Sequence, residues 1–86
     1  MNITLGRIVV YHPTEKQKLL MKGHVNCNAA NYLPAIIVAV LGDNIVNLTV
    51  FLDGDGTLWV TSSHKGDEEG EWHWPNIEVE PPLKKG

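Results

Sequence analysis

The sequence predicts a single small domain that is mostly β, and three observations support this fold class. Short runs rich in β-branched and aromatic residues recur along the chain, as is typical of strands. Turn sequences, Gly-Asp-Asn over residues 42–44 and Asp-Gly-Asp-Gly over residues 53–56, separate the later runs. A length of 86 residues leaves room for one hydrophobic core and no second.

The first strand is expected over residues 5–11, and the His-Pro pair that follows ends it, because proline cannot extend a central ladder. Thr14 then has the residue type of a helix N-cap, with Gln17 at the capping-box position and Gly23 as a stop. We therefore expect one short helix or a long ordered loop after the first strand. The next segment, up to residue 32, is rich in asparagine and has no apolar period, so it is predicted to be loop.

Four further strands are expected, at residues 34–41, 45–52, 57–63 and 71–75. The first of these is apolar on both faces, which indicates a central or interface position. The next two alternate with a period of two residues, so each has an inward and an outward face. The alternation directs Val46, Leu48, Val50, Leu52, Leu58 and Val60 inward, and Asn47, Thr49, Phe51, Trp59, Thr61 and Ser63 outward.

Short strands joined by tight turns, with one longer excursion after the first strand, predict a small SH3-like β-barrel, and a five-stranded OB-like barrel is the alternative. A barrel also removes the exposed strand edges that make small sheets aggregate. Residues 1–76 are assigned to this single domain and residues 77–86 to a C-terminal tail.

Composition excludes several function classes. Cys27 is the only cysteine, and no secretion signal opens the sequence, so a reducing, intracellular setting is expected. The apolar stretch of residues 33–41 is too short to cross a bilayer, which argues against a membrane partner. A net charge of −3 argues against binding to duplex nucleic acid. A chain this short buries little surface, so we expect a homo-oligomer to supply further stability.

Five blocks occur in a fixed order along the chain. They are GRIVVY at 6–11, PAIIV at 34–38, VNLTVFLDG at 46–54, WVTS at 59–62 and GEWHWP at 70–75. Together they resemble a widespread set of small proteins encoded by tailed phages and prophages, over nearly the whole chain. The sequence departs from that set at Val10, often a histidine there, and in a shorter segment after His12. The resemblance implies a viral protein made in the host bacterial cytoplasm. A catalytic activity does not follow from it.

Candidate catalytic and metal sites are weak in the sequence. The four histidines have no metal-ligand spacing, so no metal site is predicted. Asp53 and Asp55 lack the rest of a calcium loop and are interpreted as a hairpin turn. Ser62, Ser63 and His64 are contiguous, but no glycine-framed nucleophile elbow surrounds them. We therefore expect neither an enzyme nor a cofactor.

The aromatic residues indicate a binding surface. Three tryptophans are many for so small a core, so at least one is expected at a subunit interface or a ligand platform. Hydroxyl and cationic side chains near them suit a phosphate or a base edge. The predicted ligand-binding residues are Arg7, Tyr11, Trp59, Thr61, Ser63, His64, Lys65, Trp72 and Trp74.

The leading functional hypothesis is a phage anti-defence protein that sequesters a nucleotide immune signal, such as a cyclic dinucleotide, without turning it over. An alternative is a protein-interaction module in which the aromatic surface inhibits a host protein. A virion accessory protein is the third possibility. A ligand site should combine aromatic side chains with hydrogen-bond donors, whereas a packing interface should combine them with aliphatic side chains.

Overall fold

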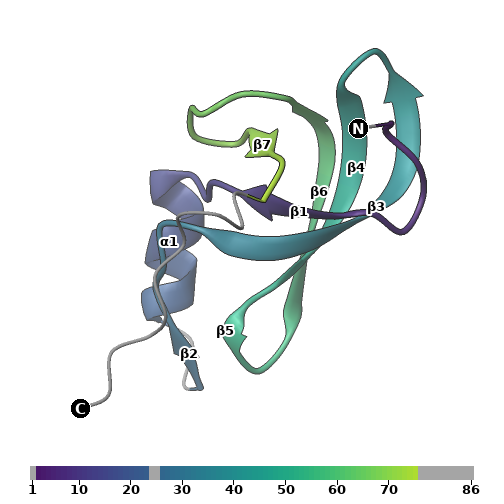
Figure 1. Cartoon of the computed structure of the whole chain (residues 1–86). Helices are drawn as coiled ribbons and strands as arrows, with labels where there is room; N and C mark the ends of the chain where they lie inside the picture. Colours follow the sequence, from purple (N-terminus) through teal and green to yellow (C-terminus); the bar gives the residue numbers. More distant parts are fainter. Residues whose placement is uncertain (1, 24–25, 76–86) are drawn as a thin grey trace.

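The computed structural model describes residues 2–23 and 26–75, which form a curled sheet with one helix beside it (Figure 1). The last eleven residues, 76–86, lie outside the described part, and the predicted tail and its boundary at residue 76 fall there. Along the chain the elements are β1 (Ile8–Tyr11), α1 (Glu15–Lys22), β2 (Cys27–Asn28), β3 (Leu33–Gly42), β4 (Ile45–Phe51), β5 (Asp53–Gly54), β6 (Thr57–His64) and β7 (Trp72–His73).

Five strands form one antiparallel sheet in the order β6-β4-β3-β1-β7, and β2 pairs with β5 in a small second sheet. The large sheet curls until its two edge strands meet, where Lys65 and Trp72 form a parallel bridge. The Gly66 amide donates to the Trp72 carbonyl at 2.8 Å at the same place. The prediction of a mostly β, small-barrel fold is confirmed as a curled half-barrel sheet.

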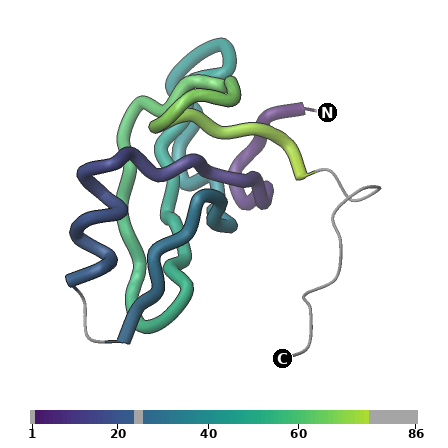
Figure 2. The backbone as a smooth tube through the Cα atoms, turned by 90° about the vertical axis from the view of Figure 1, so that its left-hand side faces the viewer, coloured from purple at the N-terminus to yellow at the C-terminus, as the bar shows by residue number. Residues whose placement is uncertain are grey.

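The segment after β1 is a helix, which its predicted caps explain. The Thr14 hydroxyl accepts from the Gln17 amide, and the Gln17 side chain accepts from the Thr14 amide, so both halves of the capping box are present. Gly23 ends the helix and donates to the Leu19 carbonyl. The helix lies to one side of the curled sheet (Figure 2) and contributes Met21 to the core. In the described residues, no helix has the length and apolar content needed to span a bilayer.

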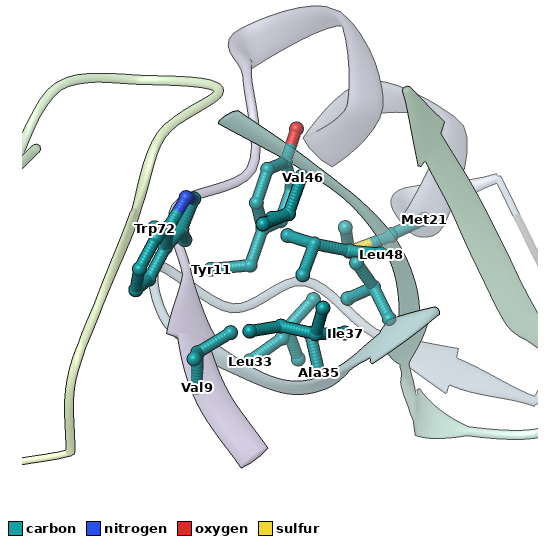
Figure 3. Packing of buried hydrophobic residues seen from close by; sticks show 10 residues of the cluster. Val9, Tyr11, Met21, Leu33, Ala35, Ile37, Val46, Leu48 and Trp72 are labelled. Atoms are coloured by element: carbon teal, nitrogen blue, oxygen red, sulfur yellow. The ribbon is translucent and has the colours of Figure 1, made fainter. Parts of the chain in front are cut away.

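The core occupies the concave side of the sheet (Figure 3). The alternation predicted for β4 is confirmed, since Val46, Leu48 and Val50 are all buried. Tyr11 and Trp72 are the largest buried side chains. The remaining core residues are Val9, Met21, Leu33, Ala35 and Ile37.

The face predicted for Ser63 is wrong, because a bulge in β6 reverses the alternation. Val46 pairs with Ser63 and Leu48 with Val60, so β6 has one more residue than β4 between these pairs. Ser62 absorbs the extra residue with φ of 56°. The Asn47 side chain stabilises the bulge by accepting from the Ser62 amide at 2.9 Å. Ser63 consequently points into the core.

Three other features differ from the prediction. The first strand begins at Ile8 rather than at residue 5, because Gly6, with φ of 85°, belongs to a turn. The asparagine-rich segment predicted as loop contains β2, which pairs with Gly54 and Asp53 of the expected hairpin turn. The last strand is confined to Trp72–His73 rather than residues 71–75.

Candidate binding face

The convex side of the sheet carries a transverse row of side chains from four strands. The strand registers align Ile8 with Ile36, Ile36 with Thr49, and Thr49 with Trp59. The residues directly before and after them along each strand point to the opposite, concave side. The β-ladder thus places an indole beside two isoleucines and a threonine on one exposed surface.

We call this surface the outer face. Its residues include no Asp, Glu, Lys or Arg, and Trp59, 64 % exposed, is the largest of them. Ile8 and Phe51 are also exposed, although both are strongly hydrophobic. Clustered apolar exposure of this kind marks interaction surfaces in soluble proteins. The outer face consists of Ile8, Val10, Pro34, Ile36, Asn47, Thr49, Phe51, Thr57, Trp59 and Thr61.

A shallow hollow of about 280 Å³ adjoins the outer face at β1 and β3. Ile8, Val10, Tyr32, Pro34 and Pro75 contribute to its walls. Its volume lies just below the range of about 300–1,000 Å³ that is usual for small-molecule sites. The hollow is thus better matched to one side chain of a partner than to a dinucleotide.

Of the predicted ligand-binding residues, only Trp59 and Thr61 lie on the outer face. Thr61 donates its hydroxyl hydrogen to the Asn47 side chain at 3.0 Å. Two more threonines lie next to Trp59. Thr57 precedes it by two positions along β6, and Thr49 pairs with it across to β4. Sequence alternation identifies these threonines, but their grouping depends on the strand register.

Three predicted residues, Tyr11, Ser63 and Trp72, are buried instead, and a fourth, Trp74, is partly buried against the core. The Tyr11 hydroxyl donates to Gln17 at 2.9 Å, and burial raises its pKa above the ordinary value of 10.0, with the hydrogen bond opposing that shift. The Ser63 hydroxyl donates to the Gly70 carbonyl at 2.8 Å rather than to a histidine, so it is not arranged as a nucleophile. Trp72 is fully buried, and Trp74 packs edge-on against it with 5.2 Å between the ring centroids.

The remaining candidates, Arg7, His64 and Lys65, are exposed but lie away from Trp59 within one chain. Arg7 immediately precedes Ile8, three strands across the sheet from Trp59, or about 14 Å at the usual strand spacing. His64 and Lys65 end β6 near the β3–β4 turn, about 16–20 Å from Trp59 along the strand. One chain therefore separates its indole platform from its cationic side chains.

Sequence reasoning missed a second group of chemically active side chains. His12 Nε2 lies 2.9 Å from His73 Nδ1. The Tyr32 ring packs edge-on against the His12 ring, with 4.8 Å between the ring centroids. Asp67 Oδ1 lies 3.9 Å from His73 Nδ1. Burial lowers the pKa of His12 from its ordinary 6.5, with His73 adding to the shift and nearby carboxylates opposing it. Because 61 residues separate the two histidines, no local spacing signals the cluster.

The chain matches no protein-family model, and neither curated proteins nor solved structures show significant similarity to it.

Proposed function

We propose that the protein is a phage-encoded, non-catalytic binding protein that sequesters a nucleotide immune signal, such as a cyclic dinucleotide, in an assembly of several copies. The observation that supports this proposal is Trp59, an indole 64 % exposed on an uncharged sheet face with threonine hydroxyls around it. Exposed aromatic side chains on a sheet surface are the platforms on which nucleic-acid-binding domains stack bases.

Stacking supplies the affinity for the base. A base on an aromatic ring contributes about 1–3 kcal/mol by alanine substitution. Thr57 and Thr61 lie two positions before and after Trp59 along β6. In the proposed complex the Thr57 hydroxyl donates to or accepts from the edge of a stacked base, and the Thr61 hydroxyl, whose hydrogen goes to Asn47, accepts from it. Without a nucleophile arranged beside this platform, the ligand would be held and not turned over.

The phosphate groups require donors that one chain does not place next to Trp59. Arg7 and Lys65 are the cationic side chains predicted for this role, and both lie well away from the indole. In an assembly, a second copy supplies them, while Ile8 and Ile36 of the outer face provide the apolar contact between copies. The mechanism is mass action: tight binding lowers the free signal below what the host effector needs.

Calorimetry with a panel of cyclic dinucleotides tests the proposal. We expect saturable binding by the native protein and a loss of about 5- to 150-fold in affinity for Trp59→Ala, the range that 1–3 kcal/mol corresponds to. Leu19→Ala is the matched control, since Leu19 is equally exposed at 65 % but lies on α1. Absence of heat and of a thermal shift with every nucleotide would overturn the proposal. Conversion of the nucleotide, seen by chromatography, would overturn its non-catalytic part.

A protein-interaction module that inhibits a host protein is the second candidate. It is favoured by the two aliphatic side chains in the row of Trp59, Ile36 two strands away and Ile8 three strands away, and by the hollow beside Pro34. Such a hollow suits an aromatic or proline anchor, as peptide-binding grooves commonly do. Recovery of one stoichiometric host protein from bacterial lysate, lost with Trp59→Ala and kept with Leu19→Ala, would favour this candidate over nucleotide binding.

A further inference from the structure

Three potential metal ligands from separate parts of the chain meet beside the β1–β7 edge. His12 directly follows β1, His73 lies in β7, and Asp67 belongs to the loop between β6 and β7. The ligand atoms of all three lie within 4.8 Å of one another. His12 and Asp67 are not part of the outer face, whereas His73 pairs with its edge residue Val10. The cluster therefore borders that face at β1 and includes neither Trp59 nor the threonines beside it.

The spacing of the ligand atoms fits a small tetrahedral ion. Imidazole nitrogen and carboxylate oxygen bind zinc at about 2.0–2.2 Å, so two ligands of one tetrahedral ion lie about 3.3 Å apart. The two histidine nitrogens are 2.9 Å apart, and His73 Nδ1 and the Asp67 oxygen are 3.9 Å apart. These two distances bracket the required value, and no pair of the three ligand atoms is more than 4.8 Å apart, so side-chain rotations are needed to bring all three atoms to one ion.

The backbone around the cluster is held by hydrogen bonds that fix two of the three ligands. The His12 amide donates to the Glu71 carbonyl at 3.0 Å, and the His12 carbonyl accepts from the Gly70 amide at 2.7 Å. His73 is paired with Val10 in the sheet. Asp67 has the fewest constraints of the three, since its side chain is 88 % exposed in a loop. The backbones of His12 and His73 are therefore fixed before a metal ion binds, and the Asp67 carboxylate completes the set of three ligands.

The charge and ligand type indicate which ion would bind. Glu68 and Glu71 join Asp67 in acting electrostatically on His12, so the surroundings are acidic and attract a cation. Two imidazoles favour zinc, nickel, copper or cobalt over calcium or magnesium, which prefer oxygen ligands only.

We propose that His12 Nε2, His73 Nδ1 and Asp67 bind one divalent transition-metal ion of the zinc class, with a fourth position open to water or a ligand. The bound ion ties the acidic β6–β7 loop to the end of β1. Binding to the folded state alone raises the stability of the domain with increasing free metal.

Metal titration of untagged, chelator-treated protein tests this site. With Zn²⁺ we expect saturable binding of about one ion per chain and a rise in the melting temperature. His12→Gln and His73→Gln should each weaken binding by at least about tenfold, the lower limit for losing even an outer-shell partner. His64→Gln, which removes an exposed histidine outside the cluster, should bind as the native protein does.

Asp67→Asn keeps the test decisive if a histidine variant fails to fold, because this exposed loop side chain has no structural role in the core. It should melt like the native protein without metal and show a reduced zinc-induced shift. In NMR spectra, zinc should move the ring signals of His12 and His73 and leave those of His64 unchanged. Native-like zinc binding by Asp67→Asn and both histidine variants, or no saturable binding by the native protein, would overturn the proposal.

Discussion

Trp59 and Trp72 form a matched pair for a quantitative test, because one chain carries the same side chain in opposite environments. Trp59 is 64 % exposed, and Trp72 is fully buried and donates its indole hydrogen to the Asn44 carbonyl at 3.3 Å. We expect Trp72→Ala to remove much of the stability of the domain and Trp59→Ala to remove little.

The burial of each tryptophan side chain sets the expected loss in the free energy of unfolding. A fully buried aromatic side chain removes about 150–250 Å² from water, so Trp59, about a third buried, removes about 50–90 Å². At about 25 cal/mol per Å² this is worth about 1–2 kcal/mol, an upper bound because the unfolded chain also buries part of that area. Replacing a fully buried tryptophan by alanine costs about 3–5 kcal/mol. The two variants should therefore differ by at least about 1 kcal/mol.

Urea unfolding followed by far-ultraviolet circular dichroism measures both changes without relying on tryptophan fluorescence. A domain of this size has about 4–13 kcal/mol of stability in total, so Trp72→Ala can exhaust the measurable range. Trp72→Phe keeps a ring and should cost about 1.5–3 kcal/mol, from lost contacts and the lost hydrogen bond. Equal costs for Trp59→Ala and Trp72→Ala would refute the assignment of the two environments.

Four further variants test three individual features of the fold. Asn47→Ala should cost about 1–2 kcal/mol in urea unfolding, because the Ser62 amide at the bulge loses its acceptor; a native-like midpoint would contradict this. Gly54→Ala should cost more than about 2 kcal/mol, because a Cβ there meets the Asn26 carbonyl oxygen, whereas Gly56→Ala, also at positive φ but in open space, should cost less. The raised pKa of Tyr11 means that the unfolded chain ionises first, so native stability should fall as pH rises above about 10. Tyr11→Phe should lose less stability over that range, and an identical pH profile for both proteins would contradict the shift.

Local sequence signals predict the parts of this fold that depend on neighbours along the chain. The capping box depends on Thr14 and Gln17 alone, and the helix forms where they predict it. The inward direction of Val46, Leu48 and Val50 follows from a period of two within one strand. Each of these features is decided within a few residues, so the pattern carries enough information.

Local sequence patterns do not predict features that depend on which strands pair and in what register. Ser63 turns inward because Ser62 adopts a bulge whose amide is satisfied by Asn47, a residue 15 positions earlier. His12 meets His73 because β7 pairs with β1 across most of the chain. Composition signals that at least one tryptophan lies outside the core, and the alternation along residues 57–63 directs Trp59 outward, but only the strand register places it in one row with Thr49. The candidate metal cluster and the grouping of the outer face both arise at this long-range level.

The separation of Trp59 from Arg7 and Lys65 leads to a further prediction about the nucleotide-binding proposal. If a site takes its indole from one copy and its cations from another, Trp59→Ala and the double variant Arg7→Ala/Lys65→Ala each fail to bind alone but complement each other when mixed. In a symmetric dimer, random mixing of equal amounts makes about half of the assemblies mixed, each with one intact site, which restores about a quarter of the native capacity. Calorimetry after co-refolding measures that capacity. If the mixture binds no better than its components, both groups act within one chain, and the proposed shared site is wrong even where nucleotide binding itself stands.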